Sequence, residues 1–172
     1  RAQALRNLKG MGEDGVRAGR VALRDERPAL IQFGAEVLLE SGRGAEIERV
    51  AQRLRDPLPG RIGPSILDRL VEVDPVHASP RLLCELLDHP KGAMRQAASK
   101  HLDAHRSPEL LAPLSALLQS KRSSTRTAAV DLIAGIEGPA SVDLLLGHLA
   151  DNSPTVCGRV LDHLARSKDE RL

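Results

Sequence analysis

The sequence repeats itself with a period of 31 or 32 residues. An aliphatic residue stands at one position of every period, and a small or aliphatic residue stands four positions before it. This spacing places both residues on one face of an α-helix. The first column consists of Leu8, Leu39, Leu70, Leu102, Ile133 and Leu164. A second column lies about half a period away and consists of Leu23, Leu54, Leu86, Leu118 and Leu149. Each period therefore predicts two amphipathic helices, which can bury their apolar stripes only against the next pair.

The apolar pattern and the prolines between its segments define the expected elements. Asp74-Pro75, Ser107-Pro108 and Gly138-Pro139 place a capping residue before a proline at the expected start of a helix. We predict an all-α fold, a right-handed α-α solenoid of about five helical pairs that follow one unpaired N-terminal helix. The expected helices are 1–10, 14–24, 29–41, 45–55, 61–73, 76–88, 93–105, 108–119, 125–136, 140–150 and 155–167.

The repeats predict one domain over residues 1–172, with boundaries near 1–12 (a partial repeat), 13–44, 45–74, 75–107, 108–138 and 139–172. An unpaired first helix would leave its apolar stripe uncovered, which is costly for a repeat protein. Because the chain also begins at Arg1 instead of a methionine, we expect it to be a fragment of a longer protein.

Two segments carry a resemblance to a known family. Met94-Arg95-Gln96-Ala97-Ala98 and Thr125-Arg126-Thr127-Ala128-Ala129 resemble HEAT repeats, most closely the short type named after phycobilisome lyase subunits. The resemblance is strongest over 81–165. It implies that the arginine of a second helix bonds an aspartate in the turn of the same or a neighbouring repeat. In this chain it implies a structural ladder in which Asp88 pairs with Arg95, while Arg126 faces Ser120 at the aspartate position.

The composition excludes several kinds of function. The chain has one Phe and neither Trp nor Tyr, so stacking on nucleobases and aromatic cages for cations are not expected. Its 25 Lys and Arg against 23 Asp and Glu are too balanced to predict binding to nucleic acid or an anionic membrane. No segment approaches the length of apolar sequence that crosses a membrane. We expect a cytoplasmic protein that does not insert into membranes.

The sequence contains no motif that predicts catalysis. Two cysteines, Cys84 and Cys157, form neither a disulfide framework nor a thiolate metal site. His101 and His105 have a spacing that could bring two imidazoles to one ion, but a histidine at a helix end is also favoured by the helix dipole. We therefore expect no catalytic residue, no cofactor and no metal.

One helix is apolar nearly all round. In the predicted helix 29–41, Leu30, Phe33 and Val37 lie opposite the residues expected in the core. They could be buried against neighbouring helices or against missing parts of the protein. The functional interpretation is an apolar patch that binds a protein or a helical peptide.

The favoured function is a non-catalytic scaffold that presents an extended surface to a protein partner or to other domains of its own chain. One alternative is weak binding of nucleic-acid phosphates along the turns within the repeats. The cations of that edge are Arg24, Arg55, Lys91, Lys121 and Arg122. A second alternative is an accessory subunit of a lyase-type enzyme.

Overall fold

The computed structural model describes residues 12–167, and within this range every regular element is helical. The predicted all-α fold is therefore confirmed, while the expected helix 1–10 lies outside the described residues. The elements are α2 (Glu13–Leu23), α3 (Pro28–Glu40), α4 (Gly44–Leu54), α5 (Ile62–Val73), α6 (Pro80–Leu87), α7 (Gly92–Ala104), the 3-10 helix η1 (Pro108–Leu110), α8 (Leu111–Leu117), α9 (Ser123–Ala134), α10 (Pro139–Leu146) and α11 (Pro154–Leu164).

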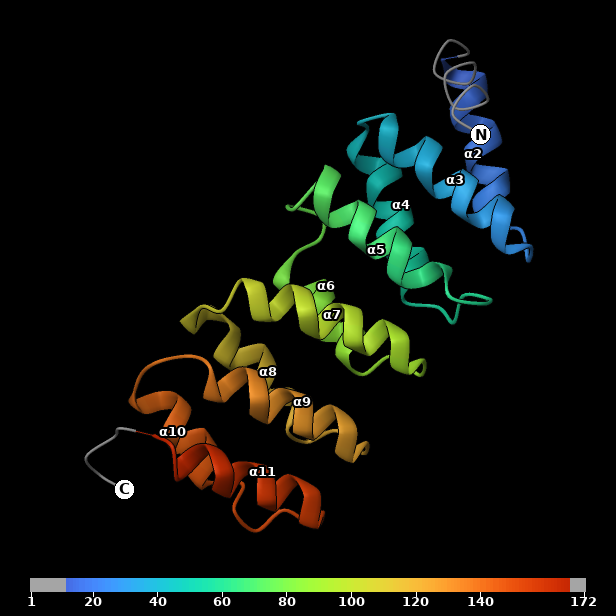
Figure 1. Cartoon of the computed structure of the whole chain (residues 1–172). Helices are drawn as coiled ribbons and strands as arrows, with labels where there is room; N and C mark the ends of the chain where they lie inside the picture. The colour runs from blue at the N-terminus through green and yellow to red at the C-terminus, as the bar shows by residue number, and fades with distance from the viewer. Residues whose placement is uncertain (1–11, 168–172) are drawn as a thin grey trace. The chain divides into compact units, whose positions relative to one another are not determined.

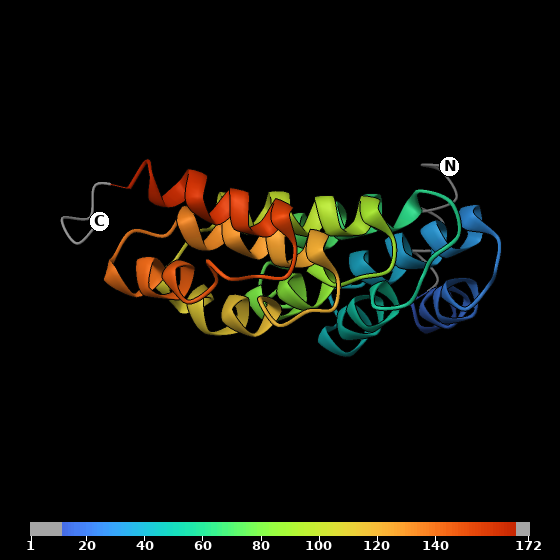
Figure 2. The same cartoon turned by 90° about the horizontal axis from the view of Figure 1, so that it is seen from below.

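The chain divides into two compact units. Unit 1 extends to Leu82 and includes 89–97, whereas unit 2 comprises 83–88 and the chain from Ala98 onward. Within unit 1, α3 packs on α2, α4 and α5, and within unit 2, α9 packs on α8, α10 and α11 (Figure 1). In each unit the helices form two layers, with α3 and α5 opposite α2 and α4, and with α9 and α11 opposite α8 and α10 (Figure 2). These layers follow from the two apolar columns of the sequence.

Small residues let the helices approach closely. Ala35 in unit 1 and Ala129 in unit 2 are fully buried beside the aliphatic column. The closest packing lies between α2 and α3. A Cβ atom added to Gly34 would stand only 2.5 Å from the backbone nitrogen of Leu23 and 2.7 Å from the carbonyl oxygen of Gly19. The two backbones therefore touch at this crossing, which only glycine permits at position 34.

One helix begins later than the sequence predicts. The helix expected at 76–88 starts at Pro80, because Asp74 forms a turn instead of a helix cap. Its Oδ1 atom accepts hydrogen bonds from the backbone N–H groups of Val76 and His77, both at 3.0 Å. Ser79 takes the capping role, since its hydroxyl oxygen accepts from the N–H of Leu82 at 3.4 Å. The sequence predicted a capping residue followed by proline at the start of this helix. The pair that begins the helix is Ser79-Pro80 and not Asp74-Pro75.

Candidate functional site

A groove lies between α3 and α5 in unit 1. It has a volume of about 360 Å³ and a floor of Ala35, Leu39 and Ile66. Polar side chains form its walls. Those from α3 are Gln32, Glu36 and Glu40, and those from α5 are Ser65, Asp68, Arg69 and Glu72.

Negative charge dominates the walls of this groove. Among the described residues that line it, four have carboxylates and one has a guanidinium. That guanidinium, of Arg69, donates to Glu72 at 3.1 Å. On the opposite wall, the amide of Gln32 donates to Glu36 at 3.3 Å. All these residues belong to two neighbouring helices of one layer, so the periodic sequence itself brings them together.

The patch predicted on α3 is only partly available. Val37 is buried, and its Cγ1 atom would stand 3.0 Å from a Cβ added to Gly19 of α2. The prediction that Val37 contributes to an exposed patch is therefore corrected. Leu30 and Phe33 are partly buried. The helix is apolar nearly all round because α2, α4 and α5 all pack on it. Contacts within the chain therefore account for the apolar side chain of Val37, and no binding partner is needed to explain it.

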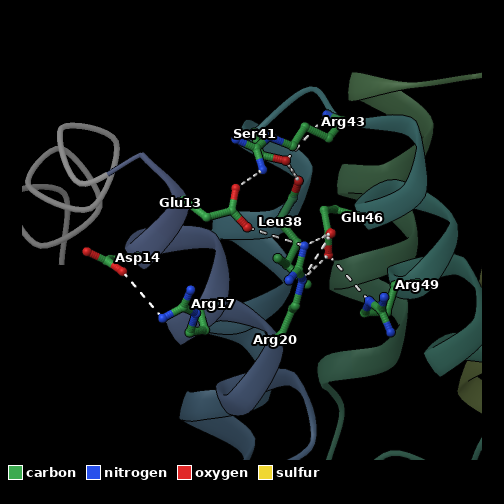
Figure 3. A network of polar contacts seen from close by, with 9 residues as sticks. All are labelled: Glu13, Asp14, Arg17, Arg20, Leu38, Ser41, Arg43, Glu46 and Arg49. Carbon is green, nitrogen blue, oxygen red and sulfur yellow. Dashed lines mark hydrogen bonds and ion pairs between the residues drawn. The ribbon is translucent and has the colours of Figure 1, made fainter.

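A polar network joins α2 to the start of α4 (Figure 3). The Nε atom of Arg20 donates to both carboxylate oxygens of the buried Glu46, at 3.0 and 3.1 Å. The hydrogen bond from Arg20 lowers the pKa of Glu46 most strongly. Arg43 forms a further ion pair with Glu13, and Arg49 donates to Glu46 at 3.3 Å. Sequence reasoning missed this network, although Glu46 stands next to the aliphatic positions of its helix.

Unit 2 contains a complete pair between an arginine and an aspartate. The side chains of Arg126 and Asp151 are only 9% and 6% exposed. The Nε and Nη2 atoms of Arg126 donate to the two carboxylate oxygens of Asp151, each at 2.8 Å. Nη2 also donates to Oδ1 of Asn152 at 2.7 Å, and Nη1 donates to the carbonyl of Ser120 at 2.8 Å. These bonds tie α9 to the turn that precedes it and to the turn between α10 and α11.

The pairing implied for Asp88 and Arg95 is corrected. In the complete pair the aspartate lies 25 residues after the arginine, and the residue at this distance from Arg95 is Ser120, which has no carboxylate. Arg95 instead donates to the carbonyls of His89 and Pro90, at 2.8 and 3.0 Å. The carboxylate of Asp88 accepts from Ser120 and Thr125, both at 2.8 Å, and from Arg122 at 3.4 Å.

Comparison with known protein families supports the repeated helical pairs of this chain. The family of HEAT repeats matches residues 80–165, which is half of the chain. The chain belongs to the HEAT repeat family. A search of curated proteins found no match to it. HEAT repeats are generally scaffolds for protein interactions, and the matched segment includes the Arg126–Asp151 pair.

The turns of the HEAT repeats use several of the cations predicted to bind phosphate. The ammonium group of Lys91 donates to the carbonyl of Leu58, and the guanidinium of Arg122 donates to both the carbonyl and the carboxylate of Asp88. Arg55 donates to Gln52 at 3.4 Å. Arg24 and Lys121 are exposed. Part of the basic edge therefore holds the turns of the repeats together.

Within residues 12–167, no three His, Cys, Asp or Glu side chains converge in a way that could hold a metal ion. His101 lies on α7 and His105 follows the last residue of that helix, and neither belongs to such a group. None of the helices in that range has the length and apolar character needed to cross a membrane.

Proposed function

We propose that this HEAT repeat chain is a non-catalytic interaction scaffold, and that the groove between α3 and α5 binds a basic segment of a protein partner. One observation supports this assignment. The groove combines an apolar floor with four carboxylates and one guanidinium, which itself has a carboxylate partner.

The chemistry of the groove favours a positively charged, partly apolar ligand. Lys and Arg carry long apolar stems that can lie along Leu39 and Ile66 while their charged ends reach the carboxylates. The partly exposed Phe33 of the same helix would extend the contact, since an aromatic ring is a favourable anchor at a protein interface. Opposite charge on the two surfaces would also speed association at low salt.

The test uses affinity purification of tagged variants from the cells that make the protein. Neutralising the groove with Glu36→Gln and Asp68→Asn should reduce recovery of the partner at least tenfold, while circular dichroism verifies that the chain remains helical. Glu109→Gln is the matched control, because Glu109 is exposed on η1 and does not line the groove. Equal recovery with the neutralised and control variants would refute this assignment.

Phosphate binding along the turns has less support. Lys91 and Arg122 already donate to groups of the protein, so a phosphate would have to compete for them. A protein ligand for the acidic groove is therefore the function that the described surface favours.

A further inference from the structure

Another pocket of unit 1 is lined by arginine side chains. It lies between the end of α2 and the side of α4, and it has a volume of about 360 Å³. Arg24 directly follows the last residue of α2, and Arg49 and Arg53 belong to α4. Leu23 and Ala45 add apolar surface to the same pocket. Three guanidinium groups from two neighbouring segments therefore line one cavity.

The hydrogen-bonding capacity of these guanidinium groups is mostly unused. Within residues 12–167, the side chain of Arg24 forms no hydrogen bond or ion pair. The side chain of Arg53 is only 24% exposed, yet it donates to the carbonyl of Leu23 and to Asp56 at 3.4 Å each. Both bonds are longer than the usual range of about 2.7–3.2 Å. Arg49 donates at 3.3 Å to a carboxylate of its own helix. A partly buried cation with such weak partners favours an anionic ligand.

Capping of the helix ends does not account for the three arginines. A cation near the C-terminus of a helix is favoured by the helix dipole, and α2 and α4 both end beside this pocket. Within the described residues, however, Arg53 is the one arginine of the three that reaches a carbonyl group. The same dipoles oppose an anion, so the guanidinium groups themselves have to supply the attraction.

Three guanidinium groups suit a phosphate better than a carboxylate. A phosphate monoester has three acceptor oxygens and a charge of about −1.5 to −2 at neutral pH, whereas a carboxylate has two oxygens and a single charge. Arginine binds phosphate through charge-assisted bonds that are often bidentate. The group that carries the phosphate can then lie against Leu23 and Ala45.

The carboxylates of the pocket restrict the ligand to a single phosphate. Glu48 and Asp56 line the same pocket, and both are exposed. They would repel the neighbouring phosphates of a nucleic acid, whose charges follow one another closely. We propose that Arg24, Arg49 and Arg53 bind one phosphate monoester, whose two sources are a small free phosphate and a phosphorylated side chain of a protein partner.

Isothermal titration calorimetry of the full chain at low salt tests this site. The probes are inorganic phosphate, a phosphoserine peptide and the same peptide with unmodified serine, which should not bind. Arg24→Gln and Arg53→Gln should each weaken binding of the phosphate probes at least about tenfold. Asp56→Asn should strengthen binding severalfold, because it removes a negative charge and a competing acceptor of Arg53. Arg27→Gln is the matched control and should bind like the wild type, because Arg27 pairs with Asp25 and does not line the pocket.

Each result supports or overturns the proposal. Tighter binding of the phosphopeptide than of inorganic phosphate supports the site with a modified side chain as its ligand, and equal binding supports it with a free phosphate. No binding of either phosphate probe overturns it. Equal losses in Arg27→Gln and Arg53→Gln would also overturn it, since general positive charge would then explain the attraction. Arg24→Gln keeps the test independent of folding, because the Arg24 side chain has no partner within residues 12–167 to lose.

A DNA oligonucleotide is the last probe. It should bind more weakly than the phosphopeptide because of Glu48 and Asp56. Equal or tighter binding of the oligonucleotide would overturn the restriction to one phosphate and favour a nucleic-acid ligand instead.

Discussion

Replacing Arg126 by methionine should destabilise unit 2 substantially. The substitution keeps much of the apolar stem but removes the guanidinium that donates to Asp151, to Asn152 and to the carbonyl of Ser120. Asp151 would then retain the N–H of Ser153, at 2.8 Å, as a hydrogen-bond donor. A carboxylate that is 6% exposed would lose its counter-charge. Water can reach it only in part.

The cost follows from what remains buried. Removing one partner of a buried ion pair costs about 3–5 kcal/mol, and we expect the lower end, about 3 kcal/mol, because the pair lies at a turn where water can replace some of the lost bonds. Arg159→Met is the matched control. Arg159 donates to Asp131 at 2.7 Å on a more exposed surface, so the loss of this solvent-screened pair should destabilise the chain far less than the loss of Arg126.

Urea unfolding followed by circular dichroism measures both variants. The double variant Arg126→Met/Asp151→Leu should lose about 2 kcal/mol less than the sum of the single variants, because no buried charge remains unpaired. A loss for Arg126→Met no larger than that for Arg159→Met would refute the reasoning.

The pH dependence provides an independent check on the same pair. The hydrogen bond from Arg126 holds the pKa of Asp151 below its ordinary value of 3.8. The pair therefore contributes fully above pH 3.8, and its contribution declines as the pH falls through the lowered pKa. The difference in unfolding free energy between wild type and Arg126→Met should shrink over that acidic range. A constant difference would contradict the assigned ion pair.

Three further substitutions test the packing of unit 1 and the candidate surface by the same unfolding measurement. Gly34→Ala should lower the free energy of unfolding by about 3 kcal/mol, because its new Cβ would collide with backbone atoms of α2. Gly158→Ala is the comparison, and it should stabilise the chain by about 0.5–1 kcal/mol because Gly158 faces open space. Equal effects of the two substitutions would contradict the close crossing. Glu46→Ala should lower the free energy of unfolding by about 2 kcal/mol, because it removes the carboxylate that accepts from Arg20 of α2. The pKa of Glu46 is lowered from 4.5, so this cost should diminish as the pH falls below 4.5. Phe33→Ala should cost about 1–2 kcal/mol, less than the roughly 3 kcal/mol of Leu38→Ala in the core; an equal cost would show that Phe33 is a core residue and unsuitable as an anchor.

The candidate site shows where prediction from the sequence succeeded and where it failed. The periodic apolar columns predicted the helices that form the groove between α3 and α5, but not the groove, because its walls are polar residues outside those columns. The sequence left open whether Val37 is buried or part of an exposed patch, because a helical wheel shows one helix alone. In the structure Val37 is buried, and it lies close to Gly19 of α2. The partner of Arg126 depended on the offset between neighbouring repeats, which a count along one repeat does not reveal.

The sequence by itself determined that the described chain is helical and arranged in pairs, because helix formation and the burial of an apolar stripe depend on residues three or four positions apart. The resemblance of two short segments to HEAT repeats was also visible in the sequence. Only the tertiary structure decided which charged groups meet, as in Arg20 with Glu46 and Arg126 with Asp151. It also decided that Val130 is covered while Leu161 is not. Val130 and Leu161 occupy equivalent positions of the repeat, so their difference in exposure arises from what packs against each of them.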